Sequence, residues 1–179
     1  QLSASYEVIV CGSFRRKKPT SGDIDVLILS PELPTEEVIK ASAVNHLHVI
    51  VEHLKKKKLI VDSLTEEGGT KYMGICKATR AGLGRRIDIR LIPYESKGAA
   101  MLYFTGSGDF NKIMRTEALK KGYTINEYGI YKTKKQGKKT VKGELIPTQT
   151  EEDIFKVVDM TYLKPEQRVT SYLKEHGLM

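Results

Sequence analysis

The first half of the chain consists of short apolar runs that are rich in β-branched residues and separated by polar, turn-forming residues. Runs of this length are typical of strands, and they predict five strands, at residues 7–11, 24–29, 59–63, 71–77 and 86–92. Residues 38–56 have a helical pattern with an expected break near residues 41–43, and Pro31 and Pro34 precede it. Strands that are first separated by a helix and then adjacent favour an α+β fold, with a mixed sheet and helices on one face.

The pattern changes after Pro93. We predict helices at residues 99–104 and 109–121, a strand at 125–131, a turn-rich and lysine-rich loop at 132–142, and a helix that begins at Thr150. Gly106 and Gly122 follow the first two helices, as glycines at helix ends often do. Thr150 and Asp153 have the spacing of a capping box. We therefore predict two lobes, residues 1–94 and a smaller α+β lobe at residues 95–179.

Two acids, Asp23 and Asp25, flank Ile24 at the start of the second predicted strand. Residues two apart on a strand point to the same side, so both carboxylates can face one cleft while Ile24 faces the core. Mg²⁺ is usually held by one or two carboxylates together with substrate phosphates. Asp88, on the last predicted strand, would add a third carboxylate. Since two such ions stabilise the attacking and leaving oxygens of a phosphoryl displacement, the pattern predicts a nucleotidyl-transfer site.

Small residues near these acids indicate a phosphate site. Gly12 allows the backbone to approach a ligand closely, and Ser13 offers a hydroxyl and an N–H at an expected helix start. Ser21 and Gly22 repeat this pattern directly before the first acid, where a bulky side chain would crowd a triphosphate.

Arg15 and Arg16 add planar guanidinium groups that match phosphate geometry. Because adjacent residues face different ways, we expect Arg16 to be the phosphate ligand. Each signal has a structural alternative: an Asp-x-Asp pair is common in turns, and an acid between arginines, as at Asp88, is often an ordinary ion pair. Their combination in one short chain favours nucleotidyl transfer.

Composition narrows the choice of partners. With 179 residues the chain can form one domain with a core or two small lobes. Its 30 Lys and Arg against 22 Asp and Glu give a formal charge of +8, which attracts polyanions in a salt-dependent way. No apolar run approaches the roughly 20 residues that cross a bilayer, so we expect no membrane. Cys11 and Cys76 are expected to be reduced thiols, and the four histidines have no zinc-ligand spacing.

Six segments in order resemble the family X DNA polymerases, and among them the DNA polymerase β type. They are Gly-Ser-Phe-Arg-Arg (12–16), Ser-Gly-Asp-Ile-Asp-Val-Leu (21–27), Arg-Arg-Ile-Asp-Ile-Arg-Leu (85–91), Tyr-Phe-Thr-Gly-Ser (103–107), Phe-Asn-Lys (110–112) and Ile-Asn-Glu-Tyr (125–128). The resemblance extends over about residues 8–162. It implies a nucleotidyltransferase-type sheet in a catalytic palm, a second lobe that closes over the nascent base pair, and template-directed DNA synthesis, with gap filling in base-excision repair as the expected role.

The resemblance also implies roles for the predicted site. Asp23, Asp25 and Asp88 match the acids that hold two Mg²⁺ ions, which Mn²⁺ can replace, and Asp88 also matches the proton acceptor beside the primer 3′-hydroxyl. The residues that match contacts to the dNTP triphosphate are Ser13, Arg16, Ser21 and Gly22. Arg86 matches a residue that hydrogen-bonds the third catalytic acid.

In the second lobe, the nucleotide-selecting positions that the resemblance implies are Tyr103, Phe104, Gly106 and Asn111. The first two match a segment that excludes a ribose 2′-hydroxyl, the glycine leaves room for the sugar, and the asparagine reaches the minor-groove edge. Lys112 and Arg115 match contacts to the template side of gapped or primed DNA. Glu127 and Arg90 match a pair that rearranges when the lobe closes.

The chain departs from the family pattern in several places. Gly108 and then Asp109 follow the Thr-Gly-Ser segment, where the pattern has an Asp at once, so a contact to the incoming base is expected to be lost or made differently. Lys17 replaces a glycine, and residues 78–84 form a shorter segment. Nothing resembles the amino-terminal lyase domain or the helix-hairpin-helix lobe, so we expect no lyase activity from this chain. It begins at Gln1, which we interpret as part of a longer intracellular protein of the nucleus, with the mitochondrion as the alternative.

Two other function classes stay open. The Gly-Ser and Asp-x-Asp pattern is shared by template-independent and RNA-tailing nucleotidyltransferases, although residues 103–112 argue against them. A basic DNA-binding module without catalysis is the third class, disfavoured because all three acids are present. Tyr103 and Phe104 would also suit an ordinary apolar core. Lys55 to Lys58 suit a solvated helix end, with contact to DNA phosphates as the alternative.

Overall fold

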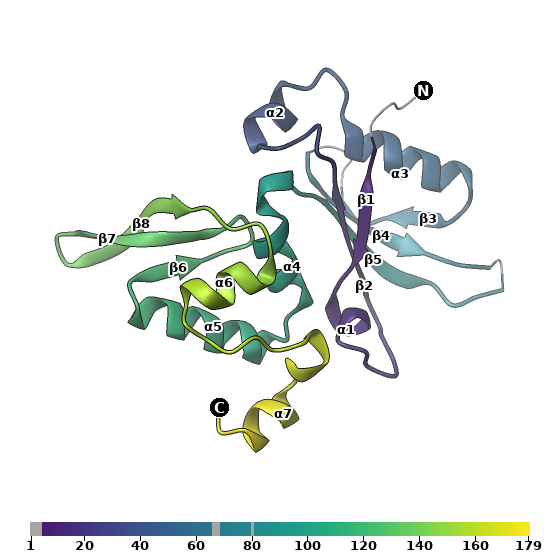
Figure 1. Ribbon diagram of the computed structural model, residues 1–179. Helices are drawn as coiled ribbons and strands as arrows, with labels where there is room; N and C mark the ends of the chain where they lie inside the picture. Colours follow the sequence, from purple (N-terminus) through teal and green to yellow (C-terminus); the bar gives the residue numbers. More distant parts are fainter. Residues whose placement is uncertain (1–4, 66–68, 80) are drawn as a thin grey trace. The chain divides into compact units, whose positions relative to one another are not determined.

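The computed structural model describes residues 5–65, 69–79 and 81–179, and the chain divides into two compact units (Figure 1). The first unit extends to Phe14 and resumes over Pro19–Tyr94, and the second comprises Arg15–Lys18 and Glu95–Met179. The segment Arg15–Lys18 is therefore distant in sequence from the unit to which its contacts assign it. The predicted α+β class is confirmed. Within the described residues, no helix has both the length and the apolar character needed to cross a bilayer.

A five-stranded mixed sheet organises the first unit. Its strands are β1 (Glu7–Val10), β2 (Ile24–Leu29), β3 (Ile60–Ser63), β4 (Lys71–Cys76) and β5 (Arg85–Leu91), in the order β1-β2-β5-β4-β3. The β2 and β5 strands pair in parallel, and the other pairs are antiparallel. The range predicted for β2 was correct, those for β1, β3 and β4 differ by one residue at one end, and that for β5 differs by one residue at each end. Short β-branched runs were therefore sufficient to locate these strands.

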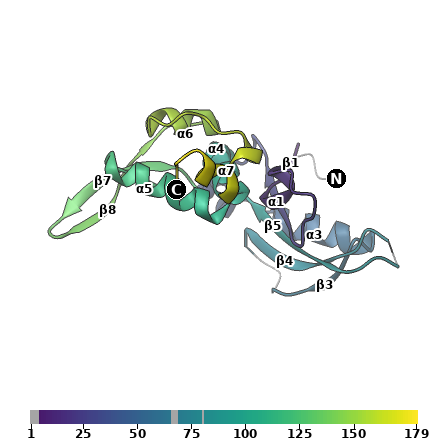
Figure 2. The ribbon, with the colours of Figure 1, turned by 90° about the horizontal axis from the view of Figure 1, so that it is seen from below.

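Two helices cover one face of this sheet, α2 (Glu36–Ala41) and α3 (His46–Lys56). The predicted break between them is confirmed, and each helix has its own N-cap: the Thr35 side chain accepts from Val38 N, and Asn45 Oδ1 accepts from His48 N at 3.0 Å. In both views α3 lies along the strands β3 to β5 (Figure 2). Its buried residues join a core that is made of Ile28, Leu33, Leu47, Val51, Ile60, Tyr72, Ile89 and Leu91.

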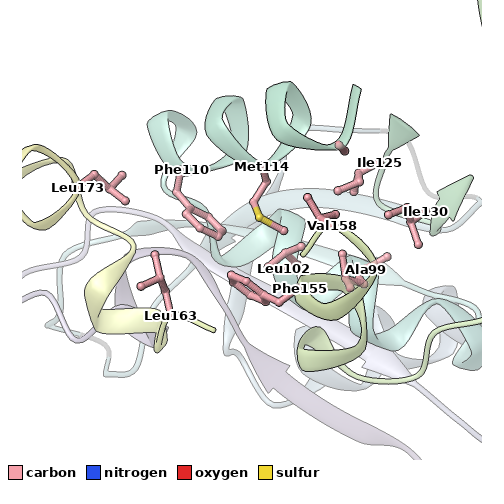
Figure 3. Close-up of a cluster of buried hydrophobic side chains, with 12 residues drawn as sticks. Ala99, Leu102, Phe110, Met114, Ile125, Ile130, Phe155, Val158, Leu163 and Leu173 are labelled. Atoms are coloured by element: carbon pink, nitrogen blue, oxygen red, sulfur yellow. The ribbon is translucent and has the colours of Figure 1, made fainter. Parts of the chain in front are cut away.

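The second unit combines helices with a three-stranded antiparallel sheet. Its helices are α4 (Lys97–Thr105), α5 (Gly108–Lys120), α6 (Glu151–Val157) and α7 (Thr170–Glu175), and its strands are β6 (Tyr123–Ile125), β7 (Ile130–Gln136) and β8 (Lys139–Ile146). Short 3₁₀ turns lie at Tyr94–Ser96 and Pro165–Gln167. Figure 3 shows Phe110 and Met114 of α5 facing Leu102 of α4 and Phe155 of α6. One apolar core therefore joins three helices of this unit.

The capping box predicted at the start of α6 is present. Thr150 Oγ1 accepts from Asp153 N at 3.2 Å, and Asp153 Oδ2 accepts from Thr150 N at 3.1 Å. This reciprocal pair satisfies backbone donors that the first turn of a helix leaves without partners. Aspartate performs here the role that glutamate or glutamine usually has.

The predicted strand at residues 125–131 was wrong, because the chain reverses direction inside it. Asn126 Oδ1 accepts from Tyr128 N at 2.9 Å and from Gly129 N at 3.1 Å, and Asn126 N donates to Gly129 O at 3.0 Å. Such asparagine turns compete with extended structure. The segment therefore contributes the end of β6 and the start of β7, joined by a turn.

The predicted loop at residues 132–142 was also wrong, because these residues form most of a β-hairpin. In the ladder of β7 and β8, Lys134 pairs with Val141 and Gln136 pairs with Lys139. Gly137, with a φ of +61°, permits the tight connection. Backbone pairing between adjacent strands thus overrides the low intrinsic strand propensity of lysine.

Candidate active site

The parallel pairing of β2 and β5 brings Asp25 and Asp88 together. They are direct partners in the ladder, and both are half-buried. Partners in a ladder present their side chains on the same face of the sheet. The helix-packed core contains Ile28 and Ile89, which point the other way along the same strands. The two carboxylates therefore lie side by side on the face opposite the helices.

Asp23 lies one residue before β2, in a bend, and is exposed. Its charge still reaches the strand, because the pKa of Asp25 is raised first by burial and then by the negative charges of Asp88 and Asp23. Arg90 and Arg86 partly oppose this rise. The three predicted acids thus form one region of concentrated negative charge.

Arg86 holds the carboxylate of Asp88. Its Nε donates to Oδ1 at 3.2 Å and its Nη2 donates to Oδ2 at 3.4 Å, while Nη2 also lies 3.9 Å from Met73 Sδ. The Asp88 side chain is only 13% exposed, so this contact is shielded on one side from water. Two donors on a single carboxylate fix its plane.

The three acids have the oxygen ligands that a hard cation such as Mg²⁺ binds, although their side chains are not yet arranged as a metal-binding group. Over residues 5–65, 69–79 and 81–179, no three His, Cys, Asp or Glu side chains already form a group that could hold a metal ion. Carboxylate oxygens are the ligands that Mg²⁺ prefers. A cation would offset the burial and the negative charges of Asp88 and Asp23 that together raise the pKa of Asp25. Arg86 now neutralises part of this charge at Asp88.

The two serines predicted to bind phosphate contact each other. Ser13 Oγ lies 2.7 Å from Ser21 Oγ, and Ser21 Oγ donates to Asp23 O at 2.9 Å. Ser13 lies in the short helix α1 (Gly12–Arg15), and Arg85 Nη1 donates to Ser21 O at 3.1 Å. Gly22 is exposed, and a Cβ built on it would meet no atom within 4 Å. Two hydroxyls and a glycine with free space beside it therefore lie together next to the start of β2.

The other predicted phosphate ligand, Arg16, belongs to the second unit. Its guanidinium donates to the carbonyl oxygen of Thr105, at the end of α4. A Cβ built on Gly106 would lie 3.3 Å from Arg16 Nη1, and the φ of Gly106 is +62°. A glycine at residue 106 therefore suits both the backbone conformation and the close approach of Arg16.

The residues predicted to select the nucleotide cluster at the junction of α4 and α5. Tyr103, 37% exposed, packs edge to face with Phe104 at a centroid distance of 5.0 Å. Asn111 Nδ2 donates to Tyr103 O at 2.9 Å. Lys112 and Arg115 are exposed on α5 and lie three residues apart, so they share one face of that helix.

Comparisons with known proteins agree with this arrangement. The family model described as DNA polymerase beta palm matches residues 1–94, and the one described as DNA polymerase beta thumb matches residues 100–169. The chain belongs to the family X DNA polymerases. It is 38% identical to DNA polymerase lambda of Rattus norvegicus over 168 residues, which is 89% of this chain and 28% of that protein.

Two further members of family X are more distant. DNA polymerase lambda of Arabidopsis thaliana is 27% identical over 89% of this chain and 31% of its own length. The Repair DNA polymerase X of African swine fever virus is 27% identical over 92% of this chain and 83% of its own length. The chain thus spans less than a third of either polymerase lambda but most of the viral polymerase.

The remaining predicted pair of this family X chain is divided between the two units. Arg90 lies on β5 in the first unit, and Glu127 lies in the turn between β6 and β7 in the second. The role of this pair therefore stays a prediction.

A charged network in the second unit was absent from the sequence prediction. Glu151, at the start of α6, accepts from Arg15 and from Arg168 through its two oxygens, and Arg15 Nη1 also donates to Thr105 Oγ1 at 2.7 Å. Arg168 is completely buried, and its Nε and Nη2 donate to Leu163 O at 3.0 and 2.9 Å. Isolated charged residues gave no periodic signal. The only pointer was a glutamate in the first turn of a helix, which normally signals capping alone.

Proposed function

We propose that this chain is the catalytic part of a template-directed DNA polymerase that transfers dNMP from a dNTP to a primer 3′-hydroxyl, as in gap filling during base-excision repair. The observation that carries this proposal is the pairing of Asp25 with Asp88 on adjacent parallel strands. Few structural roles explain two half-buried carboxylates side by side, because each raises the cost of charging the other. Phosphoryl transfer with bound cations requires such an arrangement.

Asp23, Asp25 and Asp88 are the residues that would hold two Mg²⁺ ions, or Mn²⁺ in their place. When bound, these ions neutralise phosphate charge and lower the pKa of the attacking hydroxyl. Asp88 is proposed to take the proton of the primer 3′-hydroxyl. Its contact with Arg86, at 3.2 and 3.4 Å, orients the carboxylate. Arg86 is therefore a positioning residue.

The triphosphate is proposed to bind at the small residues before β2. Ser13 and Ser21, whose hydroxyls lie 2.7 Å apart, would exchange their mutual contact for phosphate oxygens. Gly22 leaves space beside them. Arg16 would add a charged donor from the second unit, which agrees with the preference of phosphate for planar guanidinium groups.

Residues of the second unit are proposed to select the nucleotide and hold the template. Tyr103, Phe104 and Gly106 form the end of α4, where backbone and ring atoms would exclude a ribose 2′-hydroxyl. Asn111 is held toward this segment by its contact with Tyr103 O. Lys112 and Arg115 would contact template phosphates. Glu127 and Arg90 would rearrange when the second lobe closes over the nascent base pair.

The match to the viral polymerase supports activity from a chain of this extent. It covers 83% of a protein named as a repair polymerase, so little more than the matched region is present in that relative. We propose gapped or primed DNA and dNTP as partners, a nuclear site of action, and no lyase activity from these residues. The polymerase lambda relatives are much longer, so additional domains of the same protein are part of the proposal.

A single-turnover gap-filling assay with each dNTP and each rNTP tests the proposal. We expect addition only of the dNTP complementary to the template. Addition without regard to the template, or of rNTP, would support the tailing class. DNA binding without addition in the presence of Mg²⁺ or Mn²⁺ would support the non-catalytic class.

The matched variants are Asp88→Ala and Asp62→Ala. The first should reduce the incorporation rate by about 10³-fold or more, since loss of several kcal/mol of transition-state stabilisation corresponds to this factor, while dNTP affinity is largely kept. Asp62 lies on β3 of the same sheet, is exposed, and contacts Ser63 N. Its variant should incorporate at nearly the parental rate. A loss below tenfold in Asp88→Ala would reject the assignment.

A further inference from the structure

We propose that the β7–β8 hairpin is an electrostatic arm that contacts the phosphate backbone of duplex DNA. This inference rests on the proposed function, because it names a second contact with the same nucleic acid. It concerns a surface to which no predicted site residue belongs.

Charge is concentrated in this hairpin. Residues 130–146 contain six lysines and a single acid, Glu144, for a net charge of +5. The whole chain of 179 residues has a net charge of +8. About a tenth of the sequence therefore holds more than half of the excess positive charge, which is the distribution expected of a polyanion-binding element.

The hairpin presents this charge on both faces. Lys135 pairs with Thr140 and Lys134 pairs with Val141, and because adjacent residues alternate between faces, Lys134 and Lys135 point to opposite sides. Lys138 lies in the connecting turn, and Lys139 begins β8. All of these lysines are exposed.

Most of these lysines are not neutralised within the chain. The ion pair of Lys132 Nζ with Glu144 Oε2 is long, at 3.8 Å, and exposed, and Lys142 Nζ lies 4.4 Å from the centroid of the Tyr131 ring. For Lys134, Lys135, Lys138 and Lys139, the part of the chain that the structure describes contains no acidic partner within ion-pair distance. These four ammonium groups form a cluster that we call the tip lysines.

The shape of the hairpin suits DNA. Figures 1 and 2 show the outer ends of β7 and β8 projecting from the helices of the second unit. A two-stranded ribbon fits the major groove of B-DNA, and lysines two apart on a strand are about 6.6 Å from each other. Flexible lysine stems can adjust this spacing to successive phosphates. The contact would be independent of base sequence, because the tip lysines are point charges rather than paired donors.

A protein partner fits this surface less well. Protein interfaces have apolar cores and are depleted in lysine. Leu145, at the base of the hairpin, is the one large apolar side chain of β7 and β8 that is strongly exposed, at 47%. Insertion into a membrane would also need apolar residues at the tip, where Gln136, Gly137 and Thr140 lie instead.

The test measures binding of the whole chain to a gapped duplex by fluorescence anisotropy, over about 50–200 mM salt. The variant is K134Q/K135Q/K138Q/K139Q, and the charge-matched control is K55Q/K56Q/K57Q/K58Q at the end of α3. Each phosphate contact contributes about 0.9 to the slope of log K against log salt, so the tip variant should lower the slope by roughly 2–4. The control should change it by less than half as much, and K134R/K135R/K138R/K139R should keep the parental slope.

Two results of the DNA titration would overturn the inference: a parental salt slope in the tip glutamine variant, or an equal decrease of the slope in the α3 control. The inference would also be overturned if the parent bound phosphatidylserine vesicles and the tip variant lost that binding while its salt slope for DNA was unchanged. Circular dichroism of each variant checks that it is folded. The proposed function is tested separately. If DNA binding depends on the hairpin but the chain adds no nucleotide, only the polymerase proposal is refuted. If the chain adds nucleotide normally but the salt slope does not depend on the hairpin, only this inference is refuted.

Discussion

Gly12 lies directly against the carboxylate of Asp25: a Cβ built on the glycine would be 2.5 Å from Asp25 Oδ2. Gly12 also has a φ of +63°, in the left-handed region that other residues rarely adopt. The backbone of the preceding residue fixes the same aspartate, because Cys11 N donates to Asp25 O at 2.8 Å. The Asp25 carboxylate therefore occupies space that any side chain at residue 12 would fill.

This relationship predicts the effect of Gly12→Ala. The substitution should move the Asp25 carboxylate and reduce single-turnover incorporation by about 10²-fold, because displacement of a reacting group by about 1 Å has this effect. The left-handed conformation should add a loss of about 1–2 kcal/mol in the free energy of unfolding. Gap-filling kinetics and urea denaturation measure the two effects.

Gly177→Ala is the matched control for Gly12→Ala. Gly177 has a similar φ, +65°, and a Cβ built there would meet no atom within 4 Å. This control should therefore lose stability without a change in incorporation. If Gly12→Ala retained full incorporation, the steric link between Gly12 and Asp25 would be refuted.

The pKa of Asp25 leads to a prediction about stability and pH. Burial, followed by the charges of Asp88 and Asp23, raises this pKa in the folded protein. The folded state then binds a proton more readily than the unfolded state, so stability from this group is greatest below the unfolded pKa and is lost as the pH rises through the folded pKa. At neutral pH and without divalent cations, the ionised carboxylate is destabilising.

Asp25→Asn should remove this effect. The variant should melt at a higher temperature than the parent in EDTA at neutral pH, and its melting temperature should decline less between acidic and neutral pH. Mg²⁺ should raise the melting temperature of the parent more than that of the variant, since binding to the native state stabilises it. Parallel pH profiles for the two proteins would contradict the prediction. Incorporation by the variant should fall by about 10³-fold or more.

The elements of the site could be predicted because they depend on local patterns. The range Ile24–Leu29 follows from a single β-branched run, and the resemblance to family X placed Asp25 and Asp88 in one site. Their actual separation depends on the parallel register of β2 and β5. Register is a property of pairing between distant segments, so neither run contains it alone.

The hairpin and the buried charges show where local patterns are insufficient. Residues 132–142 are polar at nearly every position, so alternation gives no strand signal, and the order comes from the cross-strand ladder. The burial of Arg168 has no signal in the local sequence, because arginine is normally exposed. Its burial depends on Glu151 and on the rings of Phe110, Phe155 and Tyr162, which lie 5.4 to 5.6 Å from its guanidinium.

Removal of the Glu151 charge from its buried ion pair with Arg168 should strongly destabilise the second unit. Glu151→Gln would leave a completely buried guanidinium without its anion, and breaking such a pair typically costs about 3–5 kcal/mol in the free energy of unfolding. Urea denaturation measures this loss. The neighbouring exposed acid provides the control, since Glu152→Gln should change stability by less than about 0.5 kcal/mol. A loss below about 1 kcal/mol in Glu151→Gln would show that the pair is not structurally important.

The contact of Thr170 with Asp109 predicts the role of Asp109, which lies one residue later than the aspartate of the family pattern. Thr170 Oγ1 donates to Asp109 Oδ2 at 2.7 Å, joining the starts of α7 and α5. Thr170→Val should therefore lower the free energy of unfolding by about 1.5 kcal/mol, the lower end for a charged hydrogen bond, because the pair is half-buried. Thr170→Ser keeps the hydroxyl and should therefore lower the free energy of unfolding by less than Thr170→Val.

A double-mutant cycle decides whether this contact is the main role of Asp109. If it is, the combined effect of Thr170→Val and Asp109→Asn on stability should be clearly smaller than the sum of the single effects, since each removes the same hydrogen bond. Asp109→Asn should also leave the dNTP dissociation constant within about twofold, because a carboxylate that is engaged with α7 does not have to bind the incoming base. Additive stability effects together with weakened dNTP binding would instead assign Asp109 to the nucleotide.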